Sequence, residues 1–199
     1  MDFRKDINGL RALAVLAVVI YHFNASWLPG GFAGVDVFFV ISGYLMTAII
    51  YRGLSGGDFS LVRFYTARAK RIIPVLAAMC FALMVFGWFN LLATEYKQVA
   101  QHVYSSLGFY SNTVYLKEVG YFAASTNENW LLHTWSLSVE WQFYIIYPIV
   151  LLVLSKIFGV RAIRWLVLAA VLIGFIYSLI LSPRYPEQAF YLLKARAWE

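Results

Sequence analysis

Cysteine and charged residues are both scarce in this sequence. Cys80 is the only cysteine, so the chain can form neither an internal disulfide nor a cluster of thiolate metal ligands. Charged residues make up 13% of the 199 positions, whereas soluble proteins carry about 25%. No clustered basic surface of the kind that binds nucleic acid is expected from so few charges. The scarcity of charge therefore argues against a water-soluble globule and against a nucleic-acid-binding protein.

Large apolar side chains are abundant instead. Hydrophobic residues make up 62% of the chain and aromatic residues 19%, and the mean hydropathy is +0.70. A disordered chain has few such groups, so disorder is excluded as well. Many Trp, Tyr and Phe residues are typical of membrane proteins, in which they gather at the bilayer interfaces. The composition predicts an all-α, polytopic bundle of transmembrane helices.

Five stretches are long and apolar enough to cross a bilayer, which takes roughly 17–25 residues each. They are residues 10–28, 35–51, 72–92, 131–154 and 164–181. Pro74 is expected near the start of the third span, where a missing N–H costs least. Residues 98–125 are aromatic but too polar for a span, so we predict a re-entrant or surface-lying segment there.

Basic residues alternate between the predicted connections. The second connection holds five of them, Arg52, Arg63, Arg68, Lys70 and Arg71, whereas residues 24–34 carry no charge. Because basic loops stay in the cytoplasm, the N-terminus is predicted to be cytoplasmic and the end of the chain, from Pro183 onward, external. The chain stops soon after the fifth span, so we expect it to be the N-terminal part of a longer protein.

Two ionisable residues lie in the first predicted span. Arg11 and His22 are eleven residues apart, which brings them within about 20° of one helix face and ~16 Å apart along the axis. Such residues inside a membrane usually serve a function. The alternative is an arginine that reaches toward the interface and a histidine bonded to a backbone carbonyl.

A polar stripe is predicted on the fourth span. His133, Ser136, Glu140 and Tyr144 fall within about 60° of one face, so this face must border protein or water rather than lipid. Either it belongs to a functional site, or it is a strip of hydrogen bonds that joins helices. Asp36, which follows a glycine-rich turn, is a further candidate, or an acid that merely favours a helix N-terminus.

Arg68 and Arg71 form a third candidate group, because two guanidinium groups at i and i+3 share a helix face and suit phosphate. The alternative is that they only hold the topology of the loop. No metal site is predicted, since the three histidines are scattered and lack His-x-x-x-His spacing. His102 has no acidic neighbour at helical spacing and receives no predicted role.

Several of these residues belong to motifs that occur in the order and spacing of one known family. The motifs are Ile7–Ala12 with Arg11 ten residues before His22, Gly34–Tyr44, Arg68–Pro74, His133–Tyr144 and, cut short, Arg196–Glu199. The chain thus resembles the N-terminal half of acyltransferase family 3, whose members are bacterial inner-membrane O-acyltransferases that act on cell-surface carbohydrates. It is most similar to the branch that modifies lipopolysaccharide O-antigen or peptidoglycan, which often carries a downstream SGNH-type domain. Asn8 departs from the more usual Asp.

The resemblance implies that the whole protein moves an acyl group, expected to be acetyl, from cytoplasmic acyl-CoA to a sugar hydroxyl outside. No permanently bound cofactor or metal is implied. The acceptor would be a surface polysaccharide, a lipid-linked sugar or peptidoglycan. Arg11, Arg68 and Arg71 would bind the donor's phosphates, and His22 would act as base, directly or through an acylated His22 or serine.

The remaining candidates follow from the same mechanism. His133, Trp135 or Ser136 would stabilise the oxyanion. Glu140 would orient a histidine or the sugar, and Asp36 could contact substrate. A transporter or flippase of a polar lipid or sugar is the alternative function, although such proteins usually show internal repeats, and none is detected. A purely structural membrane anchor is the third hypothesis, and it predicts that Arg11, His22 and Glu140 tolerate apolar replacement.

Overall fold

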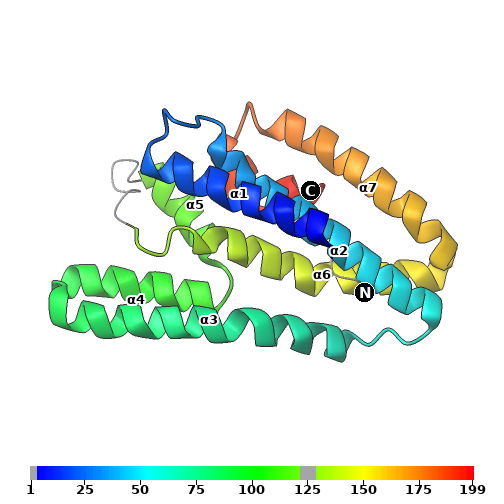
Figure 1. The fold of residues 1–199 in the computed structure, drawn as a ribbon, viewed down its shortest axis with the longest axis horizontal. Helices are drawn as coiled ribbons and strands as arrows, with labels where there is room; N and C mark the ends of the chain where they lie inside the picture. Colours follow the sequence, from blue (N-terminus) through cyan, green and yellow to red (C-terminus); the bar gives the residue numbers. More distant parts are fainter. Residues whose placement is uncertain (1–3, 122–128) are drawn as a thin grey trace. The chain divides into compact units, whose positions relative to one another are not determined.

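A computed structural model describes residues 4–121 and 129–199, and all the regular secondary structure among these residues is helical (Figure 1). The elements are α1 (Lys5–Phe23), the short 3-10 helix η1 (Gly31–Ala33), α2 (Gly34–Gly56), α3 (Leu61–Asn90), α4 (Ala93–Leu107), α5 (Ser111–Tyr121), α6 (Thr134–Phe158), α7 (Val160–Leu181), α8 (Pro186–Tyr191) and α9 (Leu193–Arg196). Within residues 4–121 and 129–199, five helical segments are long and apolar enough to cross a membrane: α1, η1 with α2, α3, α6 and α7. The prediction of an all-α protein with five spans is confirmed.

The boundaries of all five spans differ from the prediction, and those of the first and third differ most in where the helix begins. The first helix begins at Lys5 and ends at Phe23, so residues 24–28 lie in the following turns. The third begins at Leu61, because Ser60 caps it by accepting a hydrogen bond from the backbone N–H of Arg63. The expectation that Pro74 lies near a helix start is therefore wrong. Pro74 lies inside α3. Because proline has no backbone N–H, the carbonyl of Lys70 receives no helical hydrogen bond from Pro74.

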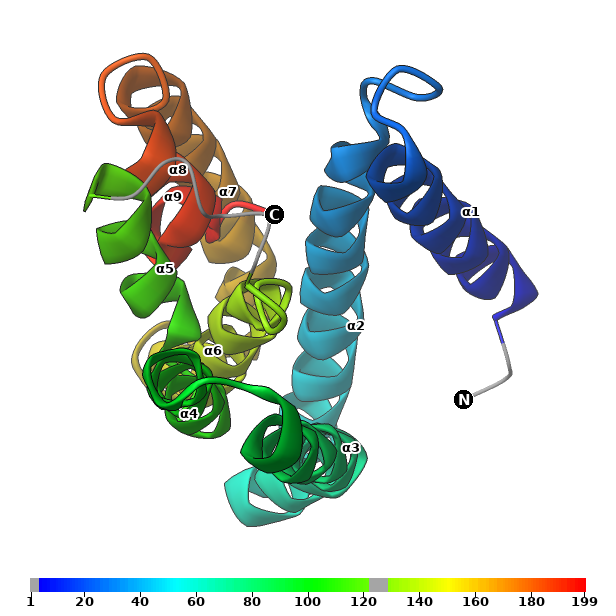
Figure 2. The ribbon, with the colours of Figure 1, turned by 90° about the vertical axis from the view of Figure 1, so that its left-hand side faces the viewer.

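The chain forms two compact units, residues 1–52 with Glu199 and residues 53–198, and each is described by itself. In the first unit, α1 and α2 form a helical hairpin (Figure 2). Glycine allows the close approach of the two arms at Gly31 and Gly34. A Cβ atom on Gly34 would lie 2.5 Å from the carbonyl oxygen of Ala14, and one on Gly31 would lie 2.4 Å from that of Ala17.

The second unit contains two further hairpins. α4 folds back along α3 after a connection of only two residues, Leu91 and Leu92 (Figure 1). Glu95 fixes this corner by accepting a hydrogen bond from the backbone N–H of Leu92 at 3.1 Å. α7 follows α6 after Gly159 alone, whose φ of +78° suits glycine because it has no Cβ.

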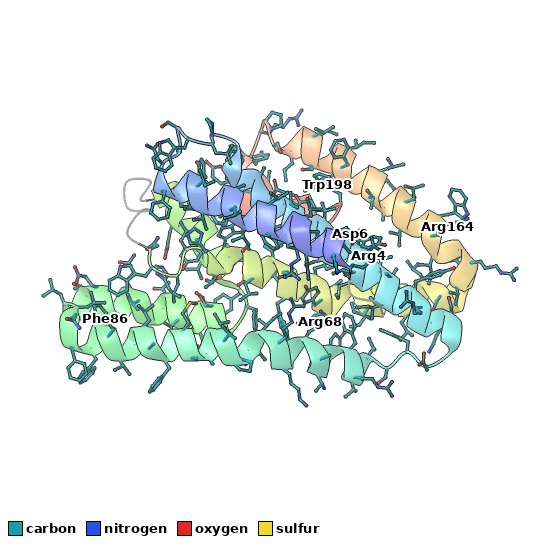
Figure 3. All side chains as sticks on the ribbon, in the orientation of Figure 1. Arg4, Asp6, Arg68, Phe86, Arg164 and Trp198 are labelled. Atoms are coloured by element: carbon teal, nitrogen blue, oxygen red, sulfur yellow. The ribbon has the colours of Figure 1, made fainter. Side chains whose placement is uncertain are left out.

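A small apolar core joins α3, α4 and the start of α6. Its fully buried members are Leu76, Cys80, Val103 and Leu131. At the other side of α6, α8 and α9 return to the bundle. Trp198, which follows α9, packs edge-on against Phe175 of α7, with ring centroids 4.9 Å apart (labelled in Figure 3).

The polar stretch predicted at residues 98–125 corresponds to the second half of α4 and to α5. Neither helix is one of the five long apolar ones, as the prediction required. Residues 122–125 of that stretch lie outside the described residues.

Candidate active site

Arg11 and His22 lie on the unbroken helix α1, so the predicted helical rotation of about 20° between them applies. Ala14 and Val18 lie between them on the same side, and both contact the position of Gly34 at the start of α2. Arg11 is half-buried, and its guanidinium carbon lies 5.8 Å from the centre of the Phe38 ring of α2. This side of α1 therefore faces α2.

His22 is exposed and bonded to its own helix. Its Nδ1 atom lies 2.7 Å from the backbone oxygen of Val18. A carbonyl oxygen can only accept, so Nδ1 carries the hydrogen, and in the neutral ring Nε2 carries the lone pair. The sequence left open that His22 only bonds to a backbone carbonyl, and this hydrogen bond is present. It also selects the tautomer whose Nε2 is a base.

Asp36 lies in the first turn of α2 and is half-buried. Because α1 ends and α2 begins at the connected end of the hairpin, Asp36 and His22 lie at that same end (Figure 2). A carboxylate at this position is favoured by the partial positive charge of the helix N-terminus.

Arg68, in the second unit, is half-buried. It lies on α3 and is labelled in Figure 3. Glu140 and Tyr144 of α6 and Arg71 of its own helix lie near enough to its guanidinium to act on it electrostatically. The Nε atom of Arg68 is buried and has no hydrogen-bond partner among the described residues. A buried guanidinium N–H without an acceptor is a place where an anion such as phosphate fits. Arg71 is exposed.

Glu140 and Tyr144 are joined on α6, where the Tyr144 hydroxyl donates a hydrogen bond to the Glu140 carboxylate. This contact agrees with the predicted common face. His133 lies just before the first residue of α6, and its backbone oxygen accepts a hydrogen bond from the Ser136 hydroxyl at 3.0 Å. The structure thus places the bonded pair Glu140 and Tyr144 of α6 near Arg68 of α3.

Trp135 lies on another side of α6. It is buried, its ring centre lies 4.5 Å from that of Phe190, and the Arg196 guanidinium lies 5.2 Å from the centre of the Trp135 ring. Arg196 also donates from Nε to the backbone oxygen of Phe190 at 2.7 Å. Trp135 is therefore packed among α8 and α9, on a different side of the helix from Glu140.

A second polar strip on α6 was not predicted. Thr134 and Ser138 bond to two serines: the Thr134 hydroxyl lies 2.7 Å from that of Ser106 on α4, and the Ser138 hydroxyl 2.8 Å from that of Ser111 on α5. Gln142 extends the strip by donating to the side-chain oxygen of Asn112 at 2.9 Å. The interhelical hydrogen-bond strip considered for His133 and Glu140 is thus found on the neighbouring face. The spacing of four between Thr134, Ser138 and Gln142 is the signal that would have revealed it.

His102 has an acidic partner after all. Its Nε2 atom lies 2.9 Å from a carboxylate oxygen of Glu118, and the His102 side chain is 4% exposed. The two residues lie on α4 and α5, so no helical spacing could reveal the pair. The ring of Tyr115 lies 4.9 Å from that of His102, centre to centre. Burial raises the pKa of the Tyr115 hydroxyl, and the Glu118 carboxylate raises it further, so the hydroxyl keeps its proton.

Comparison with known proteins gives a consistent result. The family model described as "Acyltransferase domain" matches residues 4–195. A putative O-acetyltransferase of Staphylococcus aureus (strain MSSA476) is 38% identical over 189 residues, which cover 90% of this chain and 31% of that protein. The O-acetyltransferase OatA of S. aureus (strain NCTC 8325 / PS 47) is 39% identical over 166 residues, covering 80% of this chain and 26% of OatA. The chain thus spans less than a third of these curated relatives. No solved structure matches it.

Proposed function

Since this chain belongs to the acyltransferase 3 family, we propose that it is part of a membrane O-acyltransferase that uses cytoplasmic acyl-CoA, with acetyl as the expected acyl group. The acceptor is a hydroxyl of a carbohydrate on the cell surface. Residues 1–199 then contribute the first five spans of an acyltransferase domain in the cytoplasmic membrane of a bacterium, with the N-terminus in the cytoplasm. The uncharged connection at residues 24–34 and the basic one around Arg63 support this orientation.

The observation that carries the proposal is the buried Nε atom of Arg68, which has no hydrogen-bond partner in the part of the chain that the structure describes. Acyl-CoA is a large anion with several phosphates, and planar guanidinium groups bind phosphate oxygens in pairs. Arg68, Arg71 and Arg11 are assigned to these phosphates. Glu140 lies near Arg68 and accepts from Tyr144, so a carboxylate and a phenol fix the surroundings of that guanidinium.

His22 is assigned as the base. Its Nε2 takes the proton of the acceptor hydroxyl while the hydroxyl oxygen forms a bond to the thioester carbon. The carbon–sulfur bond then breaks, and the coenzyme A sulfur receives that proton from the imidazole. The products are the sugar ester and free coenzyme A. The bond from Nδ1 to the Val18 carbonyl holds the ring in the tautomer that this step needs.

The carbonyl oxygen becomes negative during this attack and needs hydrogen-bond donors. Of the three predicted donors, we retain His133 and Ser136, which share a helix face with Glu140. Trp135 packs against Phe190 and Arg196 on a different side of α6, so we assign it to packing. Asp36, at the same end of the hairpin as His22, is retained as a substrate contact.

Binding of acyl-CoA to the purified full-length protein tests the proposal. We expect saturable binding that weakens at least about ten-fold when Arg68→Ala and Arg71→Ala are combined, because two charge-assisted contacts are lost, each worth roughly 1.5–3 kcal/mol. Arg63→Ala is the matched control, since Arg63 is an exposed arginine on the same helix. Equal affinity in all three proteins would remove Arg68 and Arg71 from the donor site. Absence of any acyl-CoA binding would favour a transporter instead.

A further inference from the structure

α4 lies beside the middle and the C-terminal half of the apolar helix α3. The short connection makes the helices antiparallel, and a Cβ atom on Gly87 would lie 3.1 Å from the ring of Tyr96. Further along, Val103 shares the buried core with Cys80. The last turns of α4 are therefore level with the middle of α3.

The last turns of α4 therefore lie beside the part of α3 that is expected to be deep in the bilayer. From Ile72 to Phe89 the helix has no charged residue, a length of about 27 Å that compares with a hydrocarbon core of about 30 Å. Cys80 lies ten residues before Asn90, or about 15 Å along the axis from the end of the helix. His102, next to Val103, is at nearly the same depth.

The side chains of α4 do not suit hydrocarbon at this depth. Gln98 and Gln101 are exposed, and Tyr104 is 72% exposed. At the deep end, His102 pairs with Glu118, whose side chain is 25% exposed. Ionisable residues in hydrocarbon cost about 2.5–3.5 kcal/mol each on insertion scales. The exposed amide groups of Gln98 and Gln101 therefore need water or polar groups beside them.

The deep end also holds an unused donor. Tyr115 is 1% exposed, and its hydroxyl has no partner within hydrogen-bonding geometry among the described residues; the Thr134 hydroxyl lies near but outside that geometry. A buried phenol without an acceptor, beside an imidazole–carboxylate pair, suits a ligand that carries hydroxyl groups. Carbohydrates are ligands of this kind.

We propose that the exposed part of α4 at Gln98 and Gln101 lines a water-filled path from outside along which the carbohydrate acceptor reaches the His102–Glu118 pair and Tyr115. The proposal rests on the proposed function for its orientation and for the nature of the acceptor. It makes α4 a re-entrant helix rather than one that lies on the membrane surface.

Thiol labelling tests the path, because Cys80 is the only cysteine and is buried. In full-length protein carrying Cys80→Ala, single cysteines are placed by Gln101→Cys and Phe81→Cys and treated in intact cells with a charged, membrane-impermeant maleimide. Phe81 is the matched control, since it is 71% exposed and lies at nearly the same depth on α3. Water favours the reactive thiolate, so we expect Gln101→Cys to react at least about ten-fold faster than Phe81→Cys.

Equal, slow reaction of both cysteines would overturn the path, since another part of the protein would then cover α4. Reaction of Gln101→Cys only from the cytoplasmic side would also overturn it. Once Gln101→Cys is fully modified, we expect acyl transfer to the carbohydrate to fall several-fold while acyl-CoA binding is unchanged. Unchanged transfer would overturn the acceptor's use of the path. Acyl-CoA binding by the unlabelled protein is scored separately, so a failure of the proposed function is recognised as such.

Discussion

The chemistry of His22 depends on which ring nitrogen carries the hydrogen. The Val18 carbonyl takes the Nδ1 hydrogen, which leaves Nε2 as the base of the neutral ring. Replacement by glutamine keeps a polar side chain of similar size but removes the base. We expect His22→Gln to lower the rate of ester formation by about 10²–10⁴-fold, the usual contribution of a general base.

Acyl-CoA binding provides the control for this variant. Because Arg68 and Arg71 are intact, the affinity of His22→Gln for acyl-CoA is expected to match that of the unaltered protein. The rates are measured as coenzyme A release and as acetyl groups on purified surface carbohydrate. Near-normal transfer in His22→Gln would exclude the imidazole as base.

Residues on one helix were predictable, and pairs between helices were not. Glu140 and Tyr144 were placed on one face from their spacing alone, and their hydrogen bond agrees with it. His102 was given no role because its partner, Glu118, lies on a different helix. The sequence predicted that Arg68 suits phosphate. It could not predict that Arg68 lies near residues of α6, because these are on a different helix.

At the scale of elements, glycine decides how closely α1 and α2 approach. Gly34 is fully buried, and a Cβ there would lie 2.5 Å from a backbone oxygen that cannot move without shifting α1. We expect Gly34→Ala to lower the stability of the folded protein by about 1–3 kcal/mol, as overpacking usually does.

Gly30→Ala is the matched variant for this prediction. Gly30 has a φ of −91° and nothing within 4 Å of an added Cβ, so the substitution is expected to be nearly neutral. The measurement is the thermal unfolding temperature of each purified variant in detergent. Equal unfolding temperatures would mean that the hairpin tolerates a wider separation of α1 and α2.

The helix α6 carries two polar faces with different surroundings. Thr134, Ser138 and Gln142 bond to α4 and α5, so this face joins helices. Glu140 and Tyr144 lie toward Arg68 of α3. The proposed function assigns chemistry only to the second of these faces. The residues that join helices and the residues proposed for chemistry are thus different residues of α6.

At the scale of the whole molecule, we propose an orientation in the membrane from the distribution of basic residues, with the N-terminus in the cytoplasm. This orientation predicts opposite accessibility for two loop positions in the Cys80→Ala protein. Ser26→Cys, in the uncharged connection of α1 and η1, is expected to react with an impermeant maleimide added outside intact cells. Asp58→Cys, between α2 and α3, is expected to react only after the cells are opened.

Both loop positions are exposed, so neither needs unfolding to react. Reaction is measured by the mobility of the labelled protein on a gel. The reverse pattern would place the N-terminus outside and would remove the cytoplasmic donor from the proposed mechanism. Reaction of both cysteines in intact cells would exclude a membrane crossing between residues 26 and 58.

The sequence alone determined how many helices can cross a membrane and which residues share a face of each. Hydropathy and the rotation of about 100° per residue are local properties, so a single segment reveals them. Only the tertiary structure decided that α4 folds back along α3, that His102 meets Glu118, and that Arg196 covers Trp135. These contacts join residues on different helices, and their geometry depends on how whole side chains pack, which no single segment specifies.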